Sequence, residues 1–398
     1  MCFSRLSRHG WRPFLACGLL ALSGALCQAQ TLIAIGGALR QDNSEVWQRI
    51  VQEAGGPGAR IAVLATASSQ PVWAAEQAMQ ALARAGAQVH HIEVAPHLPG
   101  RDWRHSLEDP QWQAWIAQAR GVFFTGGTQA LIMETLAPQG RPSALLQAIR
   151  ALYERGGVIA GTSAGAAVMS AQMIRDIPQL LPALREPLRP GQALGQGLGL
   201  LAPGVLVDQH FLRRGRIGRL LPAMLATGAH LGLGVEEDSA AVIRAGQLEV
   251  IGRRGVLLAD LSQASGQLAP LRLQGARLSY LERGDRHDLT LGLSQPAPGR
   301  RPQAPAASGE GSAAPAGQDL TLQFADNILG EHRLVAAMSM LFEAATPELL
   351  AQAWAEDAGQ RFEFRFYRDA QSQAWRDDQG ISLLRLGLDI QPLPSVPR

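Results

Sequence analysis

The residues best suited to covalent chemistry lie around Ser163, in the segment Gly161-Thr162-Ser163-Ala164-Gly165. An apolar run that is typical of a buried strand precedes it, and small helix-compatible residues follow. The Gly-x-Ser-x-Gly spacing suits a nucleophile elbow, because a turn tight enough to expose the hydroxyl strains the serine and leaves no room for neighbouring side chains. The N–H groups and dipole of the next helix would stabilise an oxyanion. A glycine-rich turn capped by a serine would give the same pattern.

A candidate general base, His210, lies further along the chain. It follows an apolar, strand-like run over 200–207 and precedes an arginine-rich stretch over 213–219. Positive neighbours lower the pKa of an imidazole, which suits a neutral general base. For any one of these arginines, a place on a solvated helix face is the alternative interpretation.

Three consecutive acids, Glu236, Glu237 and Asp238, end another apolar run over 231–235. They would form a solvated turn if no base were nearby. With His210 earlier in the chain, one of them is a candidate for the carboxylate that orients the imidazole.

A scaffold must bring these residues together. The sequence pattern predicts strands that alternate with helices. Such alternation favours an α/β fold with a mostly parallel, doubly wound sheet. Functional groups then gather beyond the carboxyl ends of the strands, where Gly36-Gly37, Gly126-Gly127 and Ser163 all lie. For Gly36-Gly37 a simple tight turn is the alternative. The expected strands span 31–35, 60–65, 88–94, 121–124 and 156–161, with helices near 44–54, 72–85 and up to 154, and short strands over 239–258 at the edge of the sheet.

The N-terminus predicts export. Residues 1–29 combine a basic head, a short apolar middle and a small-residue end, as in a signal peptide cleaved after Ala29, with lipoprotein processing at Cys27 as the alternative. All three cysteines lie in this segment, so the mature chain would have no thiol nucleophile. Its removal takes three arginines and no acids, which moves the net charge from +2 to −1. This weakens any case for nucleic-acid binding, and no membrane contact is expected after cleavage.

The sequence contains no recognisable motif for binding a nucleotide cofactor or a metal ion. Gly36-Gly37 does not continue as a dinucleotide fingerprint, no phosphate loop is present, and the adjacent His90-His91 pair does not suit a shared ion. We therefore expect no cofactor and no metal. The chain has no lysine, so an arginine must supply any cationic clamp for a carboxylate.

The C-terminal third is expected to be separate from the catalytic domain, 30–293. Residues 294–318 are rich in Pro, Ala, Gly and Ser and predict a linker or insertion. Residues 319–398 predict a small α+β appendage with helices over 332–345 and 347–354 and a strand over 361–367. Nothing in this part indicates a function.

Several motifs together resemble the cyanophycinase family of serine peptidases, which is related to the aspartyl dipeptidases. The resemblance spans residues 31–288, and its motifs are Ser163, Thr125–Gln129, Asp208–Phe211 with the arginines after it, Gly234–Asp238 and Gly284–Asp288. It implies a flavodoxin-like fold similar to that of class I glutamine amidotransferases, with serine in place of their cysteine. Glu236 stands where the family usually has an aspartate.

The resemblance also implies roles for individual residues. Ser163 would be the nucleophile, His210 the base and Glu237 the orienting acid, and the backbone N–H groups of Gly127 and Ala164 would form the oxyanion hole. The substrate would be cyanophycin, a poly-aspartate with arginine on each β-carboxyl, released as β-aspartyl-arginine by a secreted or periplasmic enzyme. Relatives suggest a homodimer. Asp208 would meet the substrate guanidinium. The implied pocket residues are Gln129, Asp208, Gln209, Arg214, Arg216 and Arg219, and Arg213 is a further candidate.

Other functions stay open at this point. Relatives with the same triad cleave short aspartyl peptides. An α/β-hydrolase esterase has the same elbow but the order serine, acid, histidine, so it would need a later histidine such as His287 or His332. A secreted binding module that keeps the pocket without turnover is the non-enzymatic alternative.

Overall fold

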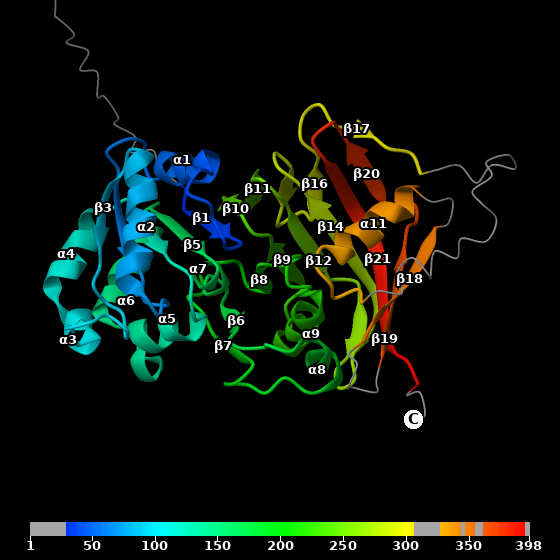
Figure 1. Cartoon of the computed structure of the whole chain (residues 1–398), viewed down its shortest axis with the longest axis horizontal. Coiled ribbons are helices and arrows are strands. Elements are labelled where there is room, and N and C mark those ends of the chain that lie inside the picture. The colour runs from blue at the N-terminus through cyan, green and yellow to red at the C-terminus, as the bar shows by residue number, and fades with distance from the viewer. Residues whose placement is uncertain (1–28, 306–326, 344–346, 355–360, 395–398) are drawn as a thin grey trace, which may run out of the picture.

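The chain folds around two large β-sheets that lie side by side (Figure 1). The computed structural model describes residues 29–305, 327–343, 347–354 and 361–394. The predicted signal peptide therefore lies almost wholly outside the described residues, as does the second half of the predicted linker. Within the described part of the chain, no helix combines the length and apolarity needed to cross a membrane.

The first sheet contains the predicted parallel strands. Its order is β16-β15-β11-β10-β1-β5-β4-β2-β3, and every neighbouring pair from β1 to β3 is parallel. The connecting helices make the crossovers that parallel strands require. The elements are β1 (Thr31–Ile35), α1 (Ser44–Glu53), β2 (Arg60–Leu64), α2 (Pro71–Arg84), β3 (Gln88–His91), α3 (Trp103–Glu108), α4 (Pro110–Gln118), β4 (Gly121–Phe124), α5 (Gln129–Leu136), η1 (Pro138–Gly140), α6 (Ala144–Glu154) and β5 (Val158–Thr162).

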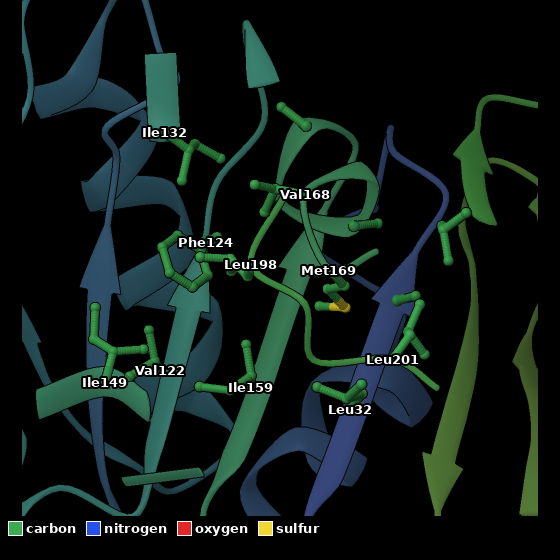
Figure 2. Packing of buried hydrophobic residues seen from close by; sticks show 14 of the residues in the cluster. Leu32, Val122, Phe124, Ile132, Ile149, Ile159, Val168, Met169, Leu198 and Leu201 are labelled. Carbon is green, nitrogen blue, oxygen red and sulfur yellow. The ribbon is translucent and has the colours of Figure 1, made fainter. Parts of the chain in front are cut away.

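Helices cover both faces of this sheet because successive strand residues point to opposite sides. Ile33 and Ile35 of β1 pack with apolar residues of α1 and α2. Leu32 and Ala34 face the other way, into a core that α4, α5 and α6 share. Figure 2 shows part of this second core, where Leu32, Val122 and Ile159 from three adjacent strands lie beneath Met169 and Leu198. The doubly wound α/β prediction is confirmed for this half of the molecule.

The prediction of one mostly parallel sheet is wrong for the rest of the chain. Beyond β1 the first sheet continues with antiparallel hairpin strands. The parallel pair β8–β9 starts a second sheet that is otherwise antiparallel, in the order β17-β20-β21-β14-β12-β9-β8. These elements are α7 (Ala164–Ala167), β6 (Gln172–Ile174), α8 (Leu180–Arg185), β7 (Leu194–Gln196), β8 (Val205–Gln209), α9 (Ile217–Thr227), β9 (Leu231–Val235), β10 (Ser239–Arg244), β11 (Gln247–Gly252), β12 (Val256–Asp260), β13 (Ser265–Gln267), β14 (Arg272–Leu281), β15 (Arg286–Asp288), β16 (Leu293–Gln295) and β17 (Arg301–Pro302).

The C-terminal region is α+β as predicted, but it is not a separate appendage. Its longest strand, β21, pairs with β14, and its helix α11 contributes to the core beneath the same sheet. In Figure 1 the red and orange C-terminal strands continue the sheet that the green and yellow strands begin. The helix predicted over 347–354 is in fact β18, paired with β19. The elements are α11 (Arg333–Glu343), β18 (Glu348–Ala353), β19 (Phe362–Tyr367), β20 (Gln373–Arg376) and β21 (Ile381–Pro392).

The first part of the predicted linker, 294–305, is ordered and anchored by a buried ion pair. Arg300, with a side chain 2% exposed, donates to Asp285, which is fully buried, at 2.6 Å. Asp285 also accepts from the Ser382 hydroxyl of β21 at 2.6 Å and from the backbone N–H of Ala297 at 2.7 Å. This network links the predicted linker to the C-terminal region and to the turn before β15.

We therefore expect Asp285→Ala to lower the free energy of unfolding by about 2–4 kcal/mol, because it removes the nearest of the carboxylates that pair with the buried Arg300 and leaves the Ser382 hydroxyl without its acceptor. Asp378→Ala, which removes an exposed carboxylate nearby, should change it by less than about 0.5 kcal/mol. Denaturant titration of both variants tests this. Equal stabilities would mean that the network does not hold the two regions together.

Candidate active site

Ser163 occupies the sharp bend between β5 and α7. Its φ is 53° and its ψ is −111°, a strained conformation for a residue with a side chain. The flanking glycines are required by contact: a Cβ on Gly161 would lie 2.3 Å from the carbonyl oxygen of Gly165, and one on Gly165 would lie 2.5 Å from that of Phe124. The helix after the bend has only four residues, so its contribution comes from local N–H groups rather than from a long helix dipole.

The structure brings the three predicted catalytic side chains together. The Ser163 Oγ lies 2.9 Å from Nε2 of His210, and Nδ1 of His210 lies 2.6 Å from Oε1 of Glu237. The carboxylate accepts the Nδ1–H, which leaves Nε2 free to accept the serine proton. Ser163 follows β5 of the first sheet, whereas the histidine and the acid follow β8 and β9 of the second.

The three consecutive acids after β9 have separate partners. Glu236 is buried and accepts from the backbone N–H groups of Leu212 and Arg213, so it holds the loop that follows His210. Asp238 adopts φ 57° and accepts from the backbone N–H of Arg40 at 3.0 Å. Only the middle acid, Glu237, points at the imidazole. The sequence pattern alone did not distinguish among the three.

Gly36-Gly37, at the end of β1, is more than a tight turn. Gly37 has φ +100°, and a Cβ there would lie 2.3 Å from the ring of His210. A Cβ on Gly36 would lie 2.0 Å from the carbonyl oxygen of Glu236. Both glycines therefore make room for the base and for the acid-bearing loop.

His210 is held ready as a neutral base. Burial lowers its pKa below the ordinary 6.5, the hydrogen bond to Glu237 opposes that shift, and the charges of Arg214 and Arg216 add to it. The net direction is downward, as the arginine-rich sequence predicted, although burial is the larger cause. The imidazole therefore stays unprotonated at neutral pH.

A cavity of about 670 Å³ opens beside Ser163. Of the predicted pocket residues, Gln129, Gln209, Arg214, Arg216 and Arg219 line it, and Gly127 lines it as well. Arg213 turns away from the cavity and pairs with Glu331.

The prediction that Asp208 contacts a substrate guanidinium is not supported by its position. The residue is 1% exposed, it does not line the cavity, and Arg219 donates to both of its carboxylate oxygens, at 2.8 and 2.5 Å. Arg216 lies 3.3 Å from the same carboxylate. Burial alone would raise the pKa of Asp208, but the two guanidinium groups outweigh burial and hold that pKa below its ordinary value. Asp208 thus positions the arginines from behind the pocket.

Two amide side chains tie the pocket wall together. Gln129 donates from Nε2 to the carbonyls of Ile174 and Arg175, at 2.8 and 2.9 Å. The Oε1 of Gln209 accepts from Arg216 at 2.5 Å. The cavity also exposes charged residues that the sequence did not single out, because their neighbourhood has no recognisable motif: Glu134, Arg175 and Asp176.

Gly127 has a backbone that suits an oxyanion hole. Its φ is +140°, and a Cβ there would lie 1.9 Å from the carbonyl oxygen of Ala67, so only glycine fits. Ala164 follows Ser163 as the first residue of α7, where an N–H has no partner within the helix. Among the described residues, no group of three or more His, Cys, Asp or Glu side chains could hold a metal ion.

The other candidate histidines lie elsewhere. His287 is buried in β15 and contacts the Ser294 hydroxyl at 2.9 Å, and His332 lies beside Arg254 and Glu331. The imidazole at Ser163 belongs to His210, which gives the order serine, histidine, acid. That order does not match the α/β-hydrolase esterases.

Comparison with known proteins agrees with this geometry. The model of peptidase family S51 matches residues 32–251, more than half of the chain. The chain belongs to peptidase family S51. It is a serine-type peptidase.

Three relatives of this S51 peptidase are cyanophycinases. That of Geminocystis herdmanii is 33% identical over 65% of this chain and 93% of its own length. That of Trichormus variabilis is 31% identical over 71% and 94%, and that of Synechococcus elongatus is 33% identical over 65% and 79%. A solved peptidase from an acI-B1 Actinobacterium covers 66% of the chain with 19% identity and a TM-score of 0.48, which is too low to compare the sites.

Gly37→Ala tests the close approach between β1 and the base. The new methyl group should push the imidazole away from Ser163 and lower kcat of the S51 peptidase by about 100-fold, with little change in KM. Gly55→Ala is the matched control, because Gly55 has a similar φ of +108° but no atom within 4 Å of the added Cβ. A Gly37→Ala enzyme with normal kcat would contradict the positioning role.

The pH profile tests the charges around His210. Because the base must be neutral, kcat/KM should rise with pH along a limb centred below pH 6.5. Arg214→Gln removes a charge that lowers the pKa of His210, so the limb should move to higher pH. Arg213→Gln, whose guanidinium pairs with Glu331, should leave it in place. If the limb of the Arg214→Gln enzyme stays at the wild-type pH or moves to lower pH, the charge of Arg214 does not lower the pKa of His210.

Proposed function

We propose that the chain is an exported serine exopeptidase that hydrolyses cyanophycin to β-aspartyl-arginine dipeptides. The observation that carries this proposal is the hydrogen-bonded series Ser163, His210 and Glu237 at the mouth of a cavity rich in arginines. The names of the similar cyanophycinases support the choice of substrate. The N-terminal sequence supports export to the periplasm or the medium.

The geometry suits acylation of the serine. His210 accepts the hydroxyl proton at Nε2 as Oγ of Ser163 attacks an aspartyl carbonyl of the substrate. The resulting oxyanion would accept from the N–H groups of Gly127 and Ala164. The imidazolium, stabilised by Glu237, then gives its proton to the leaving amine. A water molecule, deprotonated by the same imidazole, attacks the acyl-enzyme and restores the hydroxyl of Ser163.

The pocket suits the free α-carboxylates of the arginine branches of the substrate. Arg214, Arg216 and Arg219 line it and present planar guanidinium groups that can hold carboxylates through paired hydrogen bonds. Burial lowers the pKa of Arg216 only to about 10, so that guanidinium stays charged at neutral pH. A homodimer, and a fold like that of the class I glutamine amidotransferases, stay predictions from the family resemblance.

The decisive assay is the incubation of purified protein with insoluble cyanophycin and identification of the soluble products by mass. We expect β-aspartyl-arginine from the wild type. Ser163→Ala should lose at least about 1000-fold in rate while keeping its fold, because it removes the nucleophile.

Two results would replace this proposal by the alternatives. Cleavage of short aspartyl peptides without attack on cyanophycin would make the chain an aspartyl dipeptidase of other specificity. Failure of a serine-directed phosphonate to label Ser163 in folded protein would favour a binding module without turnover.

A further inference from the structure

Most charged side chains that face the cavity already have an oppositely charged neighbour. Arg175 pairs with Glu134 at 2.5 Å and donates to a backbone carbonyl. Arg216 and Arg219 share the buried carboxylate of Asp208. The Arg175–Glu134 pair therefore offers a ligand little net charge, whereas the cluster of Arg216, Arg219 and Asp208 keeps one net positive charge that can attract a carboxylate.

Two charged side chains of the cavity are different. Arg214 and Asp176 both line it, and both are exposed. Among the described residues, neither side chain forms an ion pair or a side-chain hydrogen bond. Arg214 and Asp176 are therefore a cation and an anion of the cavity wall that have no ionic partner among the described residues, and Asp176 is the lining carboxylate in that state.

The backbone around Asp176 is held firmly. The side chain of Gln129 donates to the carbonyls of the two preceding residues, at 2.8 and 2.9 Å. The guanidinium of Arg219 donates to the carbonyl of the following residue, Ile177, at 3.3 Å, and the Ile177 side chain is buried. Two pocket side chains thus fix the wall on either side of Asp176. A carboxylate on such a wall loses little conformational freedom when it binds a partner.

Resting on the proposed substrate, we propose that Asp176 is the guanidinium-binding subsite of this pocket. Each cyanophycin repeat carries on its arginine one free guanidinium and one free α-carboxylate. The unpaired Asp176 and Arg214 match that pair of opposite charges. Of the cavity's other carboxylates, Glu134 is bound to Arg175, and the nearby Asp208 is buried behind the pocket wall.

The test compares two synthetic β-aspartyl oligomers, one carrying arginine and one carrying citrulline. Citrulline keeps the shape of arginine but replaces the guanidinium by a neutral urea. The wild type should prefer the arginine oligomer in kcat/KM by about 10- to 100-fold, the value of a charge-assisted hydrogen bond. Asp176→Asn should lose that preference, mainly through a higher KM for the arginine oligomer, and should leave the citrulline rate nearly unchanged.

Glu186→Gln is the matched control. It removes the same charge ten residues further on, from an exposed carboxylate that pairs with Arg185 and does not line the cavity. This variant should keep the wild-type preference. A loss of preference in Glu186→Gln as well would point to the general field of the protein rather than to a subsite, and would overturn the proposal.

The outcomes separate the subsite from the proposed function. If the wild type degrades cyanophycin but Asp176→Asn keeps the preference for arginine, the subsite is wrong and the function stands. If the wild type cleaves neither oligomer, the proposed substrate is wrong. In that case calorimetry with β-aspartyl-arginine on Ser163→Ala protein decides about the subsite. Absence of binding, or binding that Asp176→Asn does not weaken, overturns it, whereas a loss of affinity of 10-fold or more supports it.

Discussion

Three consecutive backbone carbonyls at the end of β1 place the whole site. The carbonyl of Ile35 accepts from the N–H of Ser163 at 2.9 Å. The carbonyl of Gly36 accepts from the backbone N–H of His210 at 2.7 Å. The carbonyl of Gly37 accepts from the backbone N–H of Asp238, the neighbour of Glu237, at 2.9 Å. The nucleophile comes from the first sheet, and the base and acid come from the second. The end of β1 therefore connects the two sheets, and the absence of side chains on Gly36 and Gly37, which follow the strand, is a condition for the triad to form.

Buried acids around the site mostly serve the backbone and the arginines rather than the reaction. Glu236 binds two N–H groups of the loop after His210, and Asp208 binds the guanidinium groups of Arg216 and Arg219. A buried carboxylate is stable only with such partners. The carboxylates with a part in binding or proton transfer are then the more exposed ones. Glu237, with a side chain 24% exposed, fits that division.

The sequence predicted the parallel strands of the first sheet and the candidates Ser163 and His210, because elbow spacing and strand ends are local signals. The choice of Glu237 among three consecutive acids came from the family resemblance rather than from the pattern. The sequence did not predict that Asp208 is buried, because that depends on Arg216 and Arg219 folding back from the following helix. It also gave the wrong type for 348–353, where Leu, Ala and Gln favour a helix. The alternating burial of β18 shows that pairing with β19 overrides that propensity. The second sheet was not predicted because its strands pair over long sequence separations, which local patterns do not show.

The C-terminal region, which extends beyond the S51 match, contacts the loop that carries the base. The N–H of His332 donates to the carbonyl of Leu212 at 2.9 Å. A Cβ on Gly215, whose φ is +57°, would lie 1.9 Å from the carbonyl oxygen of Leu329. The His210 loop is thus held by β1 on one side and by residues 329–332 on the other. Because α11 and β21 also complete the core beneath the second sheet, a boundary at the end of the family match would cut through one folding unit rather than separate two.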